Sequence, residues 1–214
     1  FQSFYNNQNI HIKRNVAFTN YETRFTYNFS DSNSLELYNQ SNFTAPTMTS
    51  LNPFTDISNP LVTTQGNPDL KSTWKNTSSI YFMNRNLPKN ITYSARLKYD
   101  YTDNNISDFS FFDETGRQFR TYANISGNKS LTWDGRFTKT YKWNKNQFRI
   151  APAFFSSYTH RKGFVDGLQF TNTIYNISPR INLRLNLREI LDFTSTASLN
   201  YNFSNYTNYR VDKT

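Results

Sequence analysis

The residue types that most often carry catalysis are few in this chain and stand far apart. Neither of its two histidines, His11 and His160, has a further ligand at the spacing that zinc sites use. The adjacent acids Asp113-Glu114 lie in a polar stretch, which is typical of a solvated turn rather than a paired-acid site. Cysteine is absent, so disulfide scaffolds and cysteine nucleophiles are excluded. With no serine nucleophile elbow and no glycine-rich phosphate loop either, we expect no enzyme activity, no metal and no cofactor.

Basic side chains are the second group whose chemistry could serve a function. The 24 Lys and Arg exceed the 15 Asp and Glu, which gives a net charge of +9. Several lie on the polar faces of alternating apolar and polar segments, namely Arg96, Lys98, Arg136, Arg180, Arg184 and Arg188. One interpretation is a surface that attracts an anionic ligand or an acidic protein face. The simpler interpretation, which we prefer, is that these side chains keep a wet surface solvated.

The composition indicates how such residues are positioned. Hydrophobic residues make up only 36% of the chain and the mean hydropathy is −0.76, yet 18% of the residues are aromatic. Disordered chains are poor in aromatic residues, so this composition argues against disorder. An antiparallel sheet with one apolar, aromatic-rich face and one wet face accommodates both facts.

Strict alternation of apolar and polar residues is the strongest structural signal. It runs without a slip through 91–102 and through 177–188, where leucines alternate with arginines and asparagines. A period of two sorts these residues onto opposite faces of a strand, whereas a helix would mix them. The same alternation occurs in 21–29, 118–143 and 193–203, and less regularly in 34–45, 72–86 and 147–160. We therefore predict an all-β antiparallel meander of about eight long amphipathic strands, with 118–143 as a single strand.

The connections between these strands are of two kinds. Short turns rich in Asn, Asp, Ser and Pro fall at 31–34, 86–90, 144–146 and 189–192. Longer polar excursions lie near 44–70, 103–117 and 161–168. Short turns at one end and long loops at the other are typical of outer-membrane barrels. No run of about 18 apolar residues is present, so no membrane-spanning helix is expected, and we predict part of a large transmembrane β-barrel.

The aromatic and aliphatic positions predict which face meets lipid. Aromatic residues close to the short turns would form a girdle at the membrane boundary: Phe29, Tyr93, Tyr141, Trp143, Phe148 and Phe193. The face expected on the convex, lipid-facing surface carries Leu97, Tyr99, Leu183, Leu185, Leu199 and Tyr201. Arg96, Arg180 and Arg184 are expected on the concave surface, toward the lumen.

The two ends of the chain predict an internal segment of a barrel. Residues 1–7 lack the basic and apolar regions of a signal peptide. Residues 209–214 are polar and contain no aromatic closing strand beyond Tyr209. We therefore expect 1–214 to be a partial outer-membrane barrel, with the remaining strands and any plug domain outside this chain.

A motif in the longest excursion points to a family. Asn59-Pro60-Leu61 is followed by Gly66-Asn67-Pro68-Asp69-Leu70-Lys71 directly before a predicted strand. This order resembles the barrel region of TonB-dependent receptors, in particular the outer-membrane β-barrel group common in Bacteroidetes. In that group Pro-Glu usually follows the lysine, whereas Ser72-Thr73 stand here, so the match is incomplete. The alternation and loop organisation resemble the family along most of the 214 residues.

The resemblance implies a function and a set of partners. Such receptors take up a scarce nutrient across the bacterial outer membrane, and a TonB complex pulls on a plug domain inside the barrel. Neither a plug nor a TonB-contacting segment occurs in this sequence. The expected partners are outer-membrane lipid, a plug of the same full-length protein, the TonB complex through segments absent here, and a surface lipoprotein. Ligand contacts are expected from lumen or loop residues: Arg96, Arg136, Arg180, Arg184 and Trp74.

Three other functions fit parts of the pattern. A passive porin would share the barrel and lack energy coupling. A soluble or surface-attached β-sandwich could bind glycans through Trp74, Trp133 and Trp143, although sandwich strands are usually much shorter. A platform for single-stranded nucleic acid would carry basic and aromatic residues on one face. Here the two types are separated onto opposite faces, so no nucleic-acid partner is expected.

Overall fold

The computed structural model describes residues 17–208, which form thirteen strands and one four-residue helix. The expectations drawn from His11 and from residues 1–7 and 209–214 lie outside the described residues. The elements are β1 (Tyr21–Ser30), β2 (Asn33–Thr44), α1 (Met48–Leu51), β3 (Asp56–Asn59), β4 (Val62–Thr64), β5 (Thr73–Asn86), β6 (Ile91–Asp103), β7 (Asn105–Phe112), β8 (Gln118–Ile125), β9 (Asn128–Trp143), β10 (Asn146–Val165), β11 (Leu168–Leu187), β12 (Leu191–Ser198) and β13 (Tyr201–Asn208). Within this range no helix has the length and apolarity needed to cross a bilayer.

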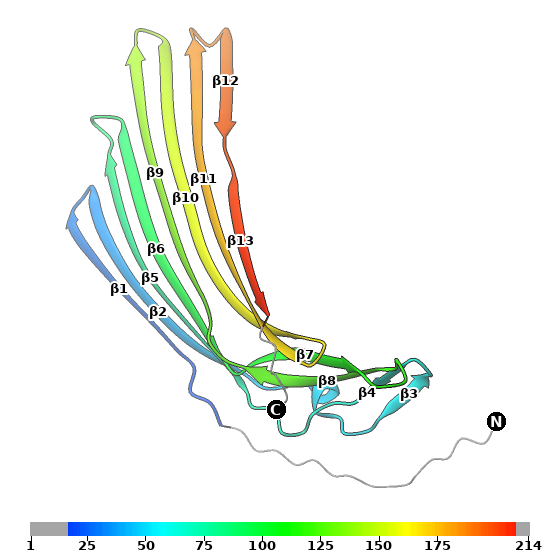
Figure 1. The fold of residues 1–214 in the computed structure, drawn as a ribbon. Coiled ribbons are helices and arrows are strands. Elements are labelled where there is room, and N and C mark those ends of the chain that lie inside the picture. The colour runs from blue at the N-terminus through cyan, green and yellow to red at the C-terminus, as the bar shows by residue number, and fades with distance from the viewer. Residues whose placement is uncertain (1–16, 209–214) are drawn as a thin grey trace.

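A curved antiparallel sheet makes up most of the molecule (Figure 1). Its strands follow one another in the order β1-β2-β5-β6-β9-β10-β11-β12, and β13 also pairs with β11. Strand β12 pairs with one half of β11 and β13 with the other half, so the two form one interrupted strand along that edge. The sheet is therefore eight strands wide, which confirms the all-β fold and the predicted meander.

The alternating sequence forms these strands because the register keeps every apolar set on one face. Leu97 on β6 lies opposite Ile80 on β5 and Trp133 on β9. Arg96 lies opposite Tyr81 and Asp134 on the other face. One ladder thus carries the apolar residues of three strands and the next ladder carries the charged ones.

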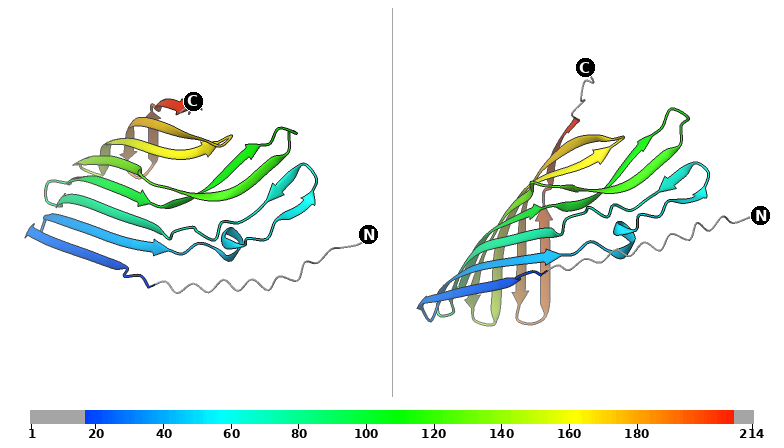
Figure 2. Two further views of the ribbon diagram at one scale, coloured as in Figure 1. Left: turned by 60° about the horizontal axis from the view of Figure 1, so that its bottom comes forward. Right: turned by 90° about the horizontal axis from the view of Figure 1, so that it is seen from below.

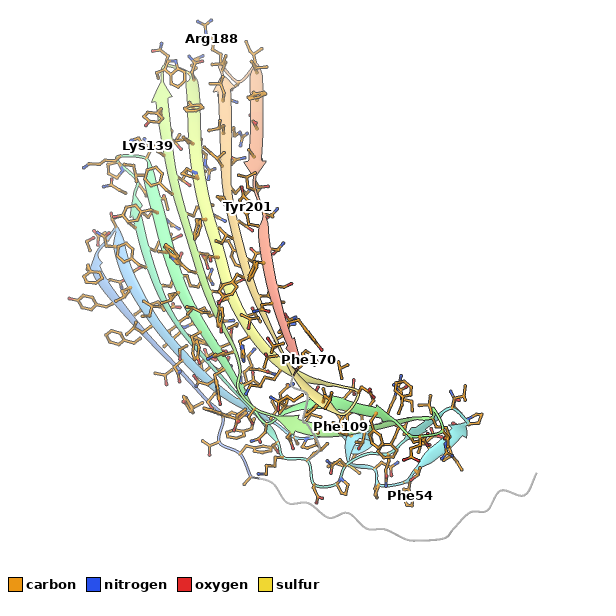
Figure 3. The ribbon with its side chains drawn as sticks, in the orientation of Figure 1. Phe54, Phe109, Lys139, Phe170, Arg188 and Tyr201 are labelled. Carbon is orange, nitrogen blue, oxygen red and sulfur yellow. The ribbon has the colours of Figure 1, made fainter. Side chains whose placement is uncertain are left out.

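The main sheet has no hydrophobic core of its own. Only Leu51, Leu70 and Ile125 are buried apolar residues among those described, and all three lie where the sheet meets the long loops. Rings on the apolar face stay open, with Phe25 56% and Trp133 53% exposed. Side chains project from both faces of the sheet without a second layer over either (Figure 3). A β-sandwich would bury one of these faces, so that alternative does not fit the described residues.

The four predicted short turns are all present at one end of the sheet. Two residues, Asp31-Ser32, join β1 to β2, and Asn144-Lys145 join β9 to β10. The left-handed conformation occurs at Asn90, Asn144, Arg188 and Glu189 in these turns. The β1–β2, β5–β6 and β9–β10 turns are successively displaced along the strand direction, and the β11–β12 turn lies level with the β9–β10 turn (Figure 1). This stagger is expected when the strands of a barrel tilt against its axis.

The predicted loop at 161–168 was wrong. Strands β10 and β11 each run for 20 residues and pair up to Val165 and Leu168. Only Asp166-Gly167 connect them, and both residues have positive φ values, 50° and 72°. Asp-Gly is a strong signal for a two-residue hairpin turn, because such turns require positive φ at both positions. The polar composition of 161–168 had concealed this signal.

Two other predictions need adjustment. The excursion at 103–117 is not an irregular loop: β7 and β8 form a hairpin that continues β6 and β9 beyond a bend at Asn104 (φ 49°). The predicted single strand 118–143 is interrupted at Ser126-Gly127, where Gly127 has φ 93°.

A second, four-stranded sheet occupies the loop end of the molecule. Its order is β3-β4-β8-β7, and β4 runs parallel to β8. This loop sheet extends sideways from the ends of the long strands (Figures 1 and 2). The excursion at 44–70 is thus folded: it supplies α1, β3 and β4 to the layer beyond the loop ends of the long strands.

Candidate functional site

The charged face of the sheet holds a hollow that three of the predicted site residues share. Arg96, Arg136 and Arg180 line a depression of about 470 Å³. They come from β6, β9 and β11, which the register brings into adjacent rows. Small residues in the same rows leave space between the guanidinium groups: Ser94, Ala153, Ser178 and Ser198.

Arg96 is held in place by two neighbours. Its Nε lies 3.2 Å from a carboxylate oxygen of Asp134, and both side chains are partly exposed. The guanidinium carbon lies 5.6 Å from the centre of the Tyr81 ring, within the range of a cation–π contact. Because its charge is already partnered, Arg96 is a fixed wall residue rather than a free anion-binding group.

Arg136 and Arg180 differ from Arg96 in having no ion-pair partner among the described residues. Both are exposed, and each is the register partner of Ala153 on the strand between them. Two uncompensated cations therefore face the same small gap. This is the part of the hollow best suited to an anion.

The structure separates the other two predicted residues from this hollow. Arg184 lies nearer the turn end of β11 and forms a two-pronged ion pair with Asp192 on β12, with Nε to Oδ1 at 3.0 Å. Trp74 lies on the apolar face at the loop end of β5. Its Nε1 donates to the Ser41 hydroxyl at 2.6 Å, and its ring packs between Phe43 and Tyr101.

Sequence reasoning missed the partners of these arginines. Tyr81, Asp134 and Phe155 line the hollow with them. Tyr81 and Phe155 belong to the less regular strands, where aromatic residues occur on both faces and the alternation does not assign sides. Only the register with β6 and β9 places them.

A second charged group lies on the same face, closer to the loops. The carboxylate of Asp100 receives Lys98 Nζ at 2.9 Å, Lys75 Nζ at 3.8 Å and the Thr77 hydroxyl at 2.6 Å. Its side chain is only 17% exposed. Two ammonium groups and one carboxylate leave the group with a net charge of +1. Because Lys75 and Thr77 lie on β5 and Asp100 lies on β6, these contacts also tie the two strands together.

The loop motif is built into the junction between the two sheets. A Cβ on Gly66 would lie 2.5 Å from the carbonyl oxygen of Asn52, so only glycine fits. The side-chain amide of Asn67 donates to the Tyr122 carbonyl on β8 at 2.9 Å. Leu70 is fully buried, and the backbone N–H of Lys71 donates to Asn124 Oδ1 at 2.6 Å. The motif thus anchors the long excursion onto β8, which is a structural role.

Carboxylates in the loop sheet serve its turns. Hydrogen bonds from the Thr115 hydroxyl and from the backbone N–H of Arg117 lower the pKa of Asp113 to about 2. The Ser58 hydroxyl and N–H lower the pKa of Asp56 in the same way. No group of three or more His, Asp or Glu side chains that could hold a metal ion occurs within residues 17–208.

The comparisons agree with this architecture. A family model described as "Outer membrane protein beta-barrel family" matches residues 5–213, nearly the whole chain. No curated protein matches the chain. The match locates the protein in the bacterial outer membrane, where the apolar face of the sheet meets lipid and the arginine face meets the water-filled lumen. The chain belongs to the outer membrane protein beta-barrel family.

Proposed function

We propose that this chain forms part of the wall of a plugged, TonB-energised transporter for nutrient uptake. The observation that carries the proposal is strand length. Strands β10 and β11 have 20 residues each, whereas about 9–11 tilted residues cross a bilayer. The seven residues 159–165 of β10 and the seven residues 168–174 of β11, about a third of each strand, stand beyond the apolar band on the loop side. Such tall walls are a feature of large barrels whose lumen is plugged.

The free edges of the sheet support a barrel with more strands. Strand β1 pairs only with β2, and the edge formed by β12 and β13 pairs only with β11 among the described residues. Unpaired backbone groups are not tolerated in lipid. We therefore infer that further strands of the full-length protein close the sheet, and that this chain is one sector of the barrel.

The lumen face is suited to solute passage rather than bond chemistry. It carries the hollow lined by Arg136 and Arg180 and the charged group around Asp100. The folded excursion near the loops offers a surface for capturing a nutrient outside the cell, alone or with a surface lipoprotein. A plug domain and the TonB complex would complete the machine, with no catalytic step in this chain.

Two measurements on the full-length protein test this function. In planar bilayers a plugged transporter gives no steady ion conductance, whereas a passive porin conducts at once. In cells that express the protein, nutrient uptake should stop when the proton gradient is collapsed. Steady conductance of the intact protein, or uptake that persists without the gradient, would contradict the proposal and favour the porin.

A further inference from the structure

The apolar face carries a polar row directly beyond a row of aromatic residues. The aromatic row crosses five strands through Tyr99, Leu131, Tyr158, Tyr175 and Phe203. Its rings contact one another, with Tyr158 and Tyr175 centroids 5.1 Å apart. The next row on the same face, toward the loops, reads Tyr101, Lys129, His160, Thr173 and Asn205. On β9, β10, β11 and β13 the apolar character therefore ends between these two rows, whereas on β2, β5 and β6 the rings of Phe43, Trp74 and Tyr101 continue it toward the loops.

The height of the apolar band, which aromatic residues bound at both ends, matches the hydrophobic thickness of the membrane. On β10 the apolar face begins at Phe148 beside the short turn and ends at Tyr158. These ten residue steps, at about 3.3 Å each along a strand tilted by about 40°, span about 25 Å. That is the height of the lipid-facing band of an outer-membrane barrel. The row containing Lys129 and His160 consequently lies at headgroup level in the outer leaflet, because long loops face outward.

Two lysines dominate the charge at this level. Lys129 is exposed and is the register partner of His160, while Lys162 lies two residues further along β10 on the same face. The Lys162 ammonium lies over Gly127, 3.1 Å from where a Cβ would stand. Both lysines act electrostatically on the His160 imidazole, so all three groups are near neighbours.

The lysines lack a committed counter-charge. Neither Lys129 nor Lys162 forms an ion pair with any described residue. The nearest carboxylate by register is that of Asp103 on the same face of β6, which accepts a hydrogen bond from the Asn104 amide at 3.2 Å. Two ammonium groups at the depth of the headgroups are thus available to an external anion.

We propose that Lys129 and Lys162 bind the phosphate groups of a phosphorylated glycolipid in the outer leaflet. The aromatic row would contact the sugar and the upper acyl chains, while the ammonium groups receive the phosphates. Basic residues at a membrane surface attract anionic headgroups in this way. The proposal rests on the lipid-facing side of the barrel and is independent of any transport activity.

Binding of lipid A to the detergent-solubilised full-length protein tests the site. Native mass spectrometry gives the affinities for bisphosphorylated lipid A and for the same lipid after enzymatic removal of its phosphates. We expect tighter binding of the phosphorylated form. K129Q and K162Q should each weaken it about fivefold, and the double variant about 25-fold. The matched control is K139Q, since Lys139 lies on β9 and on the same face but at the turn end (Figure 3).

Each of the following outcomes would contradict the proposed site. Equal affinity for the two lipids would remove the role of phosphate. An unchanged affinity in the double variant, or an equal loss in K139Q, would assign any binding to general charge. Inorganic phosphate is added as a competitor, and its displacement of lipid A at matched concentrations would identify a free-anion site instead. The melting temperature of every variant is recorded without lipid, so that loss of folding is recognised separately.

Discussion

Arg136 and Arg180 face the same side of the sheet with only Ala153 between them. Neighbouring strands lie about 4.8 Å apart, so the two backbones are separated by about 10 Å. Neither guanidinium has an acidic partner among the described residues. A ligand that neutralises both must therefore carry more than one negative charge or present an extended acidic surface, such as the flank of a plug.

The first prediction concerns the ion selectivity of the lumen. In the full-length barrel, with the proposed plug domain deleted, Arg136→Gln with Arg180→Gln should lower the anion-to-cation permeability ratio. A unit charge about 10 Å from the ion path favours an anion and disfavours a cation by about 0.4 kcal/mol each in water, so each arginine changes the ratio by a factor of about four. The double variant should thus lose about 16-fold, as measured by the reversal potential in a low-salt gradient where screening is weak.

The control for the lumen is Lys145→Gln. Lys145 lies exposed in the short β9–β10 turn, outside the hollow. Its removal changes the total charge by the same amount per residue and should leave the permeability ratio nearly unchanged. If the turn variant and the hollow variants shift the ratio equally, the hollow has no special electrostatic role.

The second prediction distinguishes the two faces of one hairpin. Leu97→Arg places a charge in the apolar band, one row inside its outer aromatic row, which should cost about 1–3 kcal/mol of folding free energy in lipid. Thr132→Arg places the same side chain on the lumen face of the neighbouring strand, where water solvates it, and should change stability by less than about 1 kcal/mol. Urea titrations of folding into lipid vesicles measure both, and equal losses would mean that the faces are assigned wrongly.

Much of the fold was predictable because the side-chain period of a strand is a local property. The alternation in 91–102 and 177–188 assigned Leu97 and Arg180 to opposite faces, and the register confirms this. The short turns were recognisable from their Asn and Asp residues. The prediction of a long loop at 161–168 failed because it rested on the polar composition of the segment. The Asp166-Gly167 pair, which favours a two-residue turn, was overlooked.

The candidate site was only partly predictable, because its geometry depends on strands distant in sequence. Arg136 and Arg180 are 44 positions apart in the printed sequence and meet across β10 only through its register with both strands. Trp74 could not be placed, since the alternation in 72–86 is too irregular to assign a face. Nor could the sequence show that Arg184 is committed to Asp192.

The third prediction concerns acid sensitivity of the loop sheet. The pKa of Asp113 is lowered to about 2 because Thr115 and Arg117 donate hydrogen bonds to its carboxylate. Its ordinary pKa is near 3.8, so its contribution to the β7–β8 turn is complete above that value and is lost as the pH falls toward 2. The protection factors of the amides at 113–117, which compare their exchange with the intrinsic rate at the same pH, should fall across this window.

The control for acid sensitivity is Asp113→Asn. The amide retains one acceptor but no charge, so protection factors in this turn should be low at neutral pH and should vary little between pH 4 and pH 2. A variant that still shows the acid-dependent step would assign the step to another group.

The fourth prediction tests the loop motif as an anchor. Gly66→Ala should detach the excursion from the sheet junction, because the new Cβ would meet backbone atoms of Asn52 and Ser50 at 2.5–2.8 Å. Overpacking of this kind costs about 1–3 kcal/mol. The loss should remain local, because the excursion lies beyond the hydrogen-bonded ladders of the long strands. Limited proteolysis should therefore cut within 45–72, while the barrel keeps its heat-modifiable migration on gels.

Gly135→Ala is the matched change within the barrel wall. A Cβ at Gly135 would lie 3.8 Å from its nearest neighbour, the Ser94 carbonyl oxygen, which is an ordinary contact distance. Because the backbone there is regular strand, alanine should leave both the protease pattern and the gel migration as they are. The contrast matters because the two glycines differ in what surrounds them and not in residue type. If Gly66→Ala also leaves 45–72 resistant, the tight fit at Gly66 does not hold the excursion, and the other motif residues, among them the buried Leu70, must keep it in place.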